Sequence, residues 1–234
     1  MKNILNKNSL SFILCLSCLS FMACDQGTKT TEETTTTTTE ERVTTDTVSE
    51  TAMDTAMAGG GMMGHMHKNM EEMRSIRKKM TGDPDHDFAQ MMTMHHQGAI
   101  RMADDEIANG TDSKMKQMAQ KTKDSNQADI KKLQDFLAKH KPTKGDTAAT
   151  MGMMHPMGKM MDDMHKNMGN MSGMNTDQNF AQMMIHHHQM GIEMTKEFLK
   201  QGKTQEMKQM AQKMMDQQQK EIKELEDWQK QNKK

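Results

Sequence analysis

The stretch Phe88-Ala89-Gln90-Met91-Met92 recurs 92 residues later as Phe180-Ala181-Gln182-Met183-Met184. With the same offset, His95-His96-Gln97 returns as His187-His188-Gln189. The seven residues that begin at Met115 return in the same way further along the chain. A single register held over such a length indicates a duplicated unit rather than chance similarity.

Each copy has the residue spacing of two helices. In the first helix of the first copy, side chains recur at steps of three or four residues, which places them on one face; they are Phe88, Met92, His95, Ala99, Met102 and Glu106. Helix stop signals follow at Asn109-Gly110 and at Pro142. The spacing predicts helices over about residues 85–108, 112–139, 176–200 and 204–231, and no alternating pattern typical of strands appears.

The fold class follows from the modest apolar faces of these helices. The two helices of each copy are expected to form a hairpin. One hairpin cannot bury its apolar face alone, but two hairpins packed together form a four-helix bundle. We therefore predict an all-α domain over residues 85–232, built from the hairpins 85–141 and 176–232. The stretches that precede them, 61–84 and 142–175, are rich in Met and His, and the sequence leaves open whether they are partly helical or disordered.

The N-terminus has the pattern of a secretory signal peptide. Two lysines precede an apolar run from Leu10 to Ala23 that is too short to span a bilayer. The run ends Phe21-Met22-Ala23-Cys24, which resembles a bacterial lipobox, so we expect residues 1–23 to be removed and Cys24 to be lipidated. The alternative is a soluble secreted protein that is cleaved nearby. Residues 24–60 are rich in Thr and Glu and predict a disordered tether.

These features place the mature protein in the cell envelope. We expect a lipid anchor that leaves the domain facing the periplasm or the cell surface, and the sequence does not specify the membrane. The chain has three cysteines, Cys15, Cys18 and Cys24. An acylated Cys24 therefore leaves the mature protein without a free thiol.

Methionine is unusually abundant in this chain. Leu, Ile, Val and Phe together number 26 of the 234 residues, whereas Met alone numbers 34. A net charge of −1 and the low aromatic content exclude a nucleic-acid-binding surface, which needs an excess of basic residues and stacking rings. Methionine is therefore either the main core-forming residue or a residue with a chemical use.

Methionine thioethers and histidine imidazoles form a soft ligand set. Such ligands select Cu(I), and Ag(I) follows the same preference by analogy, whereas Zn(II) is usually held by Cys, His and carboxylates. In a duplicated bundle, the thioethers and imidazoles of the two copies are expected to converge in the interior. The candidate metal ligands in the bundle are Met91, Met92, His95, His96, Met102, Met183, Met184, His187, His188 and Met194. The candidates in the Met/His-rich stretches are His65, His67, His155 and His165.

A simpler interpretation treats methionine as a flexible core filler. This interpretation suits the second helix of each copy, where the methionines are Met115, Met118, Met207, Met210 and Met214. It does not suit a segment such as Met151–Gly158, which has no clean helical period and much glycine. An exposed methionine gains no packing energy and is open to oxidation, so we expect a functional use there.

Three other functions compete with metal binding. A methionine-based oxidant scavenger would be consumed as sulfoxides and regenerated by reductases. A structural lipoprotein would bind no metal. A metal-dependent enzyme is least favoured, because di-iron carboxylate bundles need Glu-x-x-His pairs and the chain contains none. We therefore expect no enzymatic activity.

The doubled segments Met91–Met102 and Met183–Met194 resemble the hallmark of a bacterial secreted family, the domain of unknown function 305, whose members carry Met-Met-x-x-His-His-Gln twice. The resemblance covers about residues 84–232. It implies a ferritin-like four-helix bundle, and some members are similar to periplasmic copper-binding proteins. The family motif carries over to His95, His96, His187 and His188 with their neighbouring Met. Arg101 departs from the acidic residue usual before the closing Met of the motif, whereas Glu193 keeps it, so the two halves differ if that carboxylate matters.

The sequence as a whole predicts an envelope protein that binds several Cu(I) or Ag(I) ions and buffers them or hands them on. The bundle would hold the ordered site, and the Met/His-rich stretches would capture metal weakly. Metal ions and the membrane are the expected partners, and nucleic acid is not. The sequence does not decide whether the protein forms a homodimer or has a copper-exchange partner. It also does not decide the oxidation state of copper or the number of bound ions.

Overall fold

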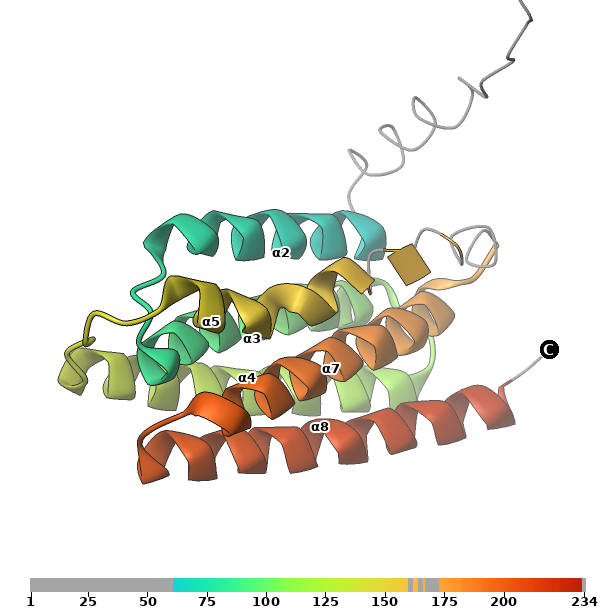
Figure 1. Ribbon diagram of the computed structural model, residues 1–234. Coiled ribbons are helices and arrows are strands. Elements are labelled where there is room, and N and C mark those ends of the chain that lie inside the picture. Colours follow the sequence, from blue (N-terminus) through green and yellow to red (C-terminus); the bar gives the residue numbers. More distant parts are fainter. Residues whose placement is uncertain (1–60, 160–161, 164–165, 167–172, 233–234) are drawn as a thin grey trace, which may run out of the picture. The chain divides into compact units, whose positions relative to one another are not determined.

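The structure, a computed structural model, describes residues 61–159, 162–163, 166 and 173–232 (Figure 1). The predicted signal peptide, Cys24, the tether and His165 lie outside the described residues. The described part is helical and contains no strand. Its elements are α2 (Met62–Ile76), η1 (Arg77–Lys79), α3 (Pro84–Asn109), α4 (Ser113–Lys139), α5 (Thr147–Met151), η2 (Gly152–Met154), α7 (Thr176–Gln201) and α8 (Gln205–Gln231).

The four long helices confirm the predicted all-α fold. Each predicted helix end agrees with α3, α4, α7 or α8 to within one residue. Helices α3 and α4 form one hairpin and α7 and α8 form the other, with α3 packed against α7. The duplicated hairpins therefore combine into a four-helix bundle.

Local sequence explains where the helices begin. The Asp83 side chain accepts hydrogen bonds from two backbone N–H groups in the first turn of α3, and Pro84 occupies its first position. At the start of α7, Asn175 and Gln178 form a capping box in which each side chain accepts a hydrogen bond from the backbone of the other. These caps satisfy N–H groups that a helix leaves unpaired at its start.

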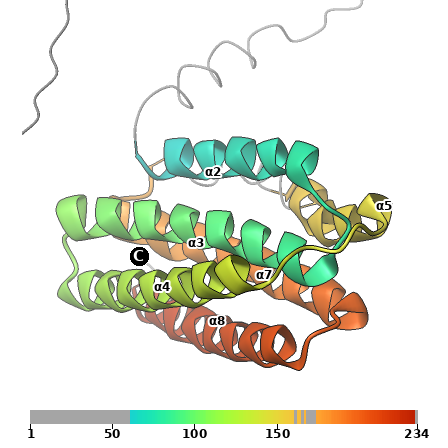
Figure 2. The ribbon, with the colours of Figure 1, turned by 90° about the vertical axis from the view of Figure 1, so that its left-hand side faces the viewer.

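A layered arrangement surrounds the central pair of helices. Helices α3 and α7 lie in the middle, α4 and α8 lie on one side, and α2 and α5 lie on the other (Figures 1 and 2). Helix α2 packs against both α3 and α7, so it closes the face of the central pair that the bundle helices leave open. Among the described helices, none combines the length and apolar character needed to cross a membrane.

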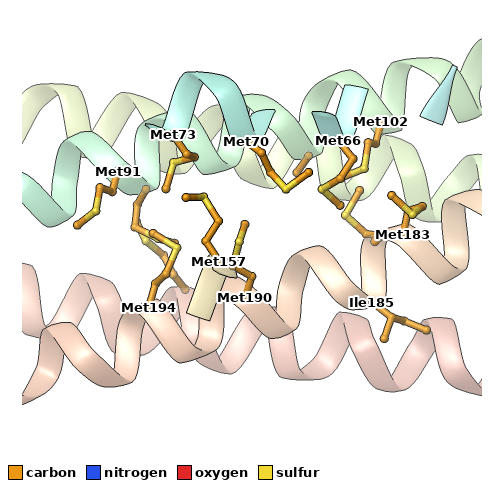
Figure 3. Packing of buried hydrophobic residues seen from close by; sticks show 14 of the residues in the cluster. Met66, Met70, Met73, Met91, Met102, Met157, Met183, Ile185, Met190 and Met194 are labelled. Atoms are coloured by element: carbon orange, nitrogen blue, oxygen red, sulfur yellow. The ribbon is translucent and has the colours of Figure 1, made fainter. Parts of the chain in front are cut away.

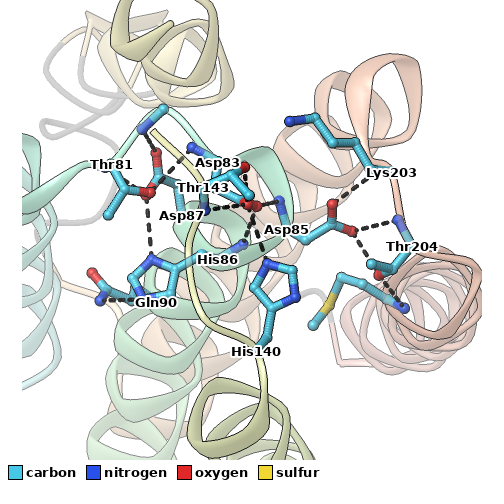
Figure 4. Close-up of polar contacts among 12 residues, drawn as sticks. Thr81, Asp83, Asp85, His86, Asp87, Gln90, His140, Thr143, Lys203 and Thr204 are labelled. Atoms are coloured by element: carbon cyan, nitrogen blue, oxygen red, sulfur yellow. Dashed lines mark hydrogen bonds and ion pairs between the residues drawn. The ribbon is translucent and has the colours of Figure 1, made fainter. Parts of the chain in front are cut away.

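Two aspartates at equivalent positions of the two copies form hydrogen bonds between the hairpins. At the start of α3, Asp85 accepts hydrogen bonds from the backbone N–H groups of Lys203 (2.8 Å) and Thr204 (3.0 Å), in the turn of the other hairpin (Figure 4). At the start of α7, Asp177 accepts hydrogen bonds from the N–H (2.8 Å) and hydroxyl (2.7 Å) of Thr111, in the turn of the first hairpin. Each hairpin turn is thus held by the first helix of the other copy.

Methionines of both Met/His-rich stretches are buried, whereas those in Met151–Gly158 were expected to be exposed. On α2, Met62, Met66, Met70 and Met73 are buried, and their steps of four, four and three residues form a helical stripe. In the second stretch, Met153, Met154 and Met157 are buried. The expectation of exposed methionines was wrong at Met153, Met154 and Met157, and the described parts of both stretches extend the core of the bundle.

The two copies differ where their first helices end. Phe198 in the second copy stacks on Phe88, with ring centroids 4.1 Å apart. The equivalent residue in the first copy is Glu106, which is fully buried. Burial, together with the neighbouring carboxyl group of Asp177, raises the pKa of Glu106 to about 8. Glu106 is therefore mostly protonated at neutral pH.

Candidate metal centre

His95 of α3 and His187 of α7 meet in the interior of the bundle. Both side chains are buried, and their ring centroids lie 3.8 Å apart with an angle of 31° between the ring planes. The Nε2 atom of His95 lies 3.0 Å from the backbone carbonyl oxygen of His187. The structure therefore brings one imidazole from each copy together, as the duplication predicts.

The hydrogen bond from His95 defines the protonation of its ring. A carbonyl oxygen only accepts hydrogen bonds, so Nε2 must carry a proton. Burial and the nearby His96 and His188 hold the pKa of His95 well below its usual range, so the ring is neutral at neutral pH. Its single proton is then on Nε2, and Nδ1 presents a lone pair. Within the described residues, this buried Nδ1 has no hydrogen-bond partner.

His187, on α7, is also buried and also has a lowered pKa. Burial, and then the nearby His95 and His188, hold its pKa well below the usual range. The amide nitrogen Nδ2 of Asn69 lies 3.4 Å from Nε2 of His187. Asn69 is fully buried and comes from α2, so the Met/His-rich stretch reaches the central histidine pair.

Asn69 can reach His187 because Gly98 leaves room for it. A Cβ atom built on Gly98 would lie 2.3 Å from Cγ of Asn69. Sequence reasoning missed Asn69 as a site residue. Its signal was a polar residue that directly precedes Met70 in the buried stripe of α2.

His96 and His188 point to their own hairpins rather than to the central pair. The Nε2 atom of His188 lies 2.8 Å from Oε2 of Glu221 on α8. The Nε2 atom of His96 lies 3.9 Å from Oδ2 of Asp129 on α4. Asp129 and Glu221 are equivalent in the duplication, and the signal that reveals them is an acidic residue 33 positions after the second histidine of each doublet.

These contacts lower the pKa values of the Glu221 and Asp129 carboxyl groups. Burial alone would raise the pKa of Glu221, but the contacts with His188, together with hydrogen bonds from Gln217 and Thr122, outweigh burial and hold the pKa below its ordinary value. Asp129 behaves in the same way, with His96 and Lys132 outweighing the effect of burial. In metal sites, a carboxylate that accepts the N–H of a histidine commonly orients the ring so that its other nitrogen can coordinate. Within the described residues, Nδ1 of His96 and Nδ1 of His188 are buried without a hydrogen-bond partner.

A layer of buried thioethers lies between α2 and the central helices. Figure 3 shows side chains from α2 directed toward α7, and side chains from α7 directed back toward α2. The labelled methionines are Met66, Met70, Met73, Met91, Met102, Met157, Met183, Met190 and Met194. All of them belong to a single buried cluster, which we call the methionine layer.

The ten candidate ligands of the bundle are all buried; they are Met91, Met92, His95, His96, Met102, Met183, Met184, His187, His188 and Met194. Of the candidates in the Met/His-rich stretches, the three that the structure describes are not brought into the interior. His65 and His67 are half-buried, with His67 Nε2 3.4 Å from Glu71, and His155 is exposed.

The donor atoms decide which metal would suit this interior. In the part of the chain that the structure describes, no group of three or more His, Cys, Asp or Glu side chains is arranged to hold a metal ion. Nitrogen from the central histidines and sulfur from the methionine layer are the donors available there. This combination suits Cu(I) and Ag(I) and not the harder ions that prefer oxygen.

The sequence comparison identifies the family. The family model described as "Domain of unknown function (DUF305)" matches the chain twice, over residues 25–137 and 138–229. The chain belongs to this family. The two matches each contain one copy of the hairpin, and the resemblance drawn from the doubled motif is confirmed. A search of curated proteins found no match to this DUF305 chain.

Solved structures similar to this DUF305 chain include CopM and a fragment from the same family. The Ag-bound form of CopM obtained by soaking has 24% sequence identity and a TM-score of 0.48, covering 64% of this chain and 97% of that chain. The apo form of CopM has the same identity and TM-score. A DUF305 fragment from Deinococcus radiodurans has 19% identity and a TM-score of 0.45, covering 61% of this chain and 93% of that chain.

Proposed function

We propose that this protein binds Cu(I) or Ag(I) in the bacterial cell envelope and buffers the ion or hands it on. The observation that carries the proposal is the buried lone pair on Nδ1 of His95, beside His187 and without a hydrogen-bond partner in the described residues. A buried polar atom left without a partner costs folding free energy. A bound metal ion would compensate that cost.

Sulfur donors in the same interior support a monovalent soft ion. The methionine layer supplies thioethers from α2, α3 and α7. A thioether has no proton to lose, and His95 and His187 are neutral at neutral pH because burial lowers their pKa. Binding would therefore displace no proton, and its affinity would change little between pH 6 and 8.

The proposed location depends on the N-terminal pattern. Residues 1–23 resemble a signal peptide and Cys24 ends a lipobox-like segment. A lipid-anchored protein with thioether and imidazole ligands suits an oxidising envelope, because its site cannot be lost to disulfide formation. We propose a binding role there rather than catalysis, with metal exchange as the expected contact with other proteins.

The oxidant-scavenger alternative is weakened by the burial of methionine. Half of the chain's 34 methionines are buried in the described structure. Sulfoxide formation follows exposure, so these side chains would react slowly unless the fold opened. The alternative predicts fast oxidation without any role for the central histidines.

The test is a Cu(I) titration under a competing chelator. We expect the double substitution His95→Ala and His187→Ala to weaken binding by at least about tenfold, by analogy with the loss of supporting groups in metal sites. The control is His65→Ala with His67→Ala, which removes two imidazoles from outside the interior. Circular dichroism checks that each variant remains helical. Equal affinity in the wild type and the central variant would refute the proposal.

A further inference from the structure

Three segments that are far apart in the chain meet at the start of α3. One is the segment that joins α2 to α3 and includes η1. The Asp83 carboxylate accepts hydrogen bonds from the backbone N–H (3.0 Å) and the hydroxyl (2.8 Å) of Thr143, in the segment between α4 and α5. The Asp85 carboxylate accepts a hydrogen bond from the backbone N–H of Lys203 (2.8 Å), in the turn between α7 and α8 (Figure 4). These contacts hold the three segments together at one end of the bundle.

The three segments carry basic side chains, which we call the basic end. They are Arg77, Lys78 and Lys79 of η1, Lys141 and Lys144 between α4 and α5, and Lys203 between α7 and α8. All six side chains are exposed. None of them forms an ion pair with another described residue. Their charges are therefore free to attract an anionic partner.

The carboxylates at this end differ from the basic side chains in their exposure. Asp83, Asp85 and Asp87 are buried, and each accepts hydrogen bonds from backbone N–H groups. Asp146 and Glu206, which follow these segments in the chain, are exposed. Exposed basic side chains thus outnumber exposed carboxylates in these segments, although the whole chain has a net charge of −1.

The type of basic residue favours a broad anionic surface as the partner. Five of the six residues of the basic end are lysines. A lysine ammonium is a point charge on a flexible stem, whereas the planar guanidinium of arginine suits a bidentate contact with one carboxylate or phosphate. Clusters of about four to eight basic residues beside a membrane bind anionic phospholipid headgroups, and each residue adds a share of the attraction.

The chain that precedes α2 is long enough to let this end reach a bilayer. From the proposed lipid anchor at Cys24, residues 25–60 can span more than about 100 Å at up to about 3.5 Å per residue. The 15 residues of α2 add only about 22 Å between its start and the basic end. The attachment point therefore allows the far end of α2 to contact the membrane that holds the anchor.

We propose that the basic end docks on the anionic phospholipid surface of the membrane to which the protein is anchored. The lysine ammonium groups pair with lipid phosphates, so the start of α3 faces the bilayer. This inference rests on the proposed envelope location and not on the metal centre. His95 lies about 15 Å from Asp85 along the axis of α3, so a docked domain keeps its buried histidine pair away from the lipid contact.

The test is co-sedimentation of the mature chain, without its leader or lipid, with vesicles in the presence of a metal chelator. We expect binding to vesicles that contain phosphatidylglycerol and none to vesicles of phosphatidylcholine alone. Binding should weaken as the salt concentration rises, because salt screens the attraction between exposed charges. The triple substitution Lys78→Glu, Lys144→Glu and Lys203→Glu, one change in each segment, should weaken binding by at least about tenfold.

A matched control variant separates this surface from the net charge of the protein. It carries three reversals at exposed, unpaired lysines outside the basic end: Lys68→Glu, Lys114→Glu and Lys213→Glu. We expect the control to keep the vesicle affinity of the wild type, and circular dichroism checks that both variants remain helical. Equal losses in the two variants would overturn the proposal, because the effect would then belong to net charge.

Two further outcomes would also overturn the proposal. One is the absence of wild-type binding to phosphatidylglycerol vesicles. The other is salt-sensitive binding to an acidic polypeptide such as polyglutamate without vesicle binding, which would make the partner a protein. The variant of the basic end should bind Cu(I) as the wild type does. Failure of membrane docking and failure of metal binding are therefore seen in separate measurements.

Discussion

The imidazole rings of His95 and His187 lie 3.8 Å apart, although 92 residues separate them in the chain. The contact joins equivalent positions of the two copies, so it lies where the first helices of the hairpins cross. The carbonyl oxygen of His187 accepts the Nε2–H of His95 at 3.0 Å, which leaves the lone pair on Nδ1 of His95 without a hydrogen-bond partner in the described residues. A soft metal ion is the ligand that we propose for this lone pair, in the same buried interior as the methionine layer.

Metal binding at this pair should stabilise the fold. A ligand that binds only the folded state raises the unfolding free energy by RT ln(1 + [L]/Kd), or about 2.7 kcal/mol at a hundredfold excess over Kd. We expect Ag(I) to raise the thermal unfolding midpoint of the wild type by several degrees. The rise should disappear in the His95→Ala and His187→Ala variant. An unchanged midpoint in the wild type with saturating Ag(I) would speak against a folded-state site.

The close approach of Asn69 to Gly98 predicts a coupled pair of substitutions. Gly98→Ala would place a Cβ 2.3 Å from Cγ of Asn69 and should cost about 1–3 kcal/mol of unfolding free energy. With Asn69→Ala in the same chain, the clash is removed and the additional cost of Gly98→Ala should largely vanish. Urea unfolding of the four variants gives this coupling. Gly158→Ala is the matched control, because nothing lies within 4 Å of its added Cβ. Strictly additive effects would show that the two residues do not touch.

The two histidine–carboxylate pairs should differ in strength. Glu221 lies 2.8 Å from His188 inside the bundle, whereas Asp129 lies 3.9 Å from His96. Removing one partner from a buried pair costs about 3–5 kcal/mol, because the other group is left without compensation. We expect Glu221→Ala to reach this range and Asp129→Ala to cost less. Chemical denaturation at neutral pH measures both, and equal costs would contradict the distances.

Glu106 should make the protein less stable as the pH rises. Its pKa is raised from 4.5 to about 8 by burial and by Asp177, so between these values the folded state binds a proton that the unfolded state does not. The unfolding free energy then falls by about 1.4 kcal/mol per pH unit across this window and levels off above pH 8. Glu106→Gln should remove this dependence. The difference in unfolding free energy between the variant and the wild type should therefore change between pH 5, 7 and 9. The exposed Glu71→Gln should leave the slope as it is, and a constant difference for Glu106→Gln would contradict the shift.

Most of the helical fold was predictable because its signals are local. The caps at Asp83 and Asn175 and the breaks after each helix involve residues close in the chain, and they set the helix ends to within one residue. The role of α2 was harder to predict. Its buried stripe of methionines has a helical spacing, but the sequence left open whether residues 61–84 are partly helical or disordered. The surface that makes this stripe part of the core is supplied by α3 and α7.

The candidate site was predictable in its residue types and only partly in its geometry. Burial of the histidine doublets follows from their place on the inward face of the first helices. The carboxylate partners Asp129 and Glu221 were missed, since a residue 33 positions away is brought close only by the hairpin turn. Asn69 was missed for the same reason, because its contact with His187 spans 118 residues.

Local sequence signals are enough to specify that two equivalent helical hairpins form and where their helices begin and end, because capping, helix breaks and apolar spacing act between near neighbours. Which histidine of each doublet faces the other copy depends instead on how the helices pack together. Adjacent residues on a helix project about 100° apart, so His95 and His96 cannot face the same neighbour. Packing of the second hairpin and of α2 turned His95 toward His187 and left His96 facing α4.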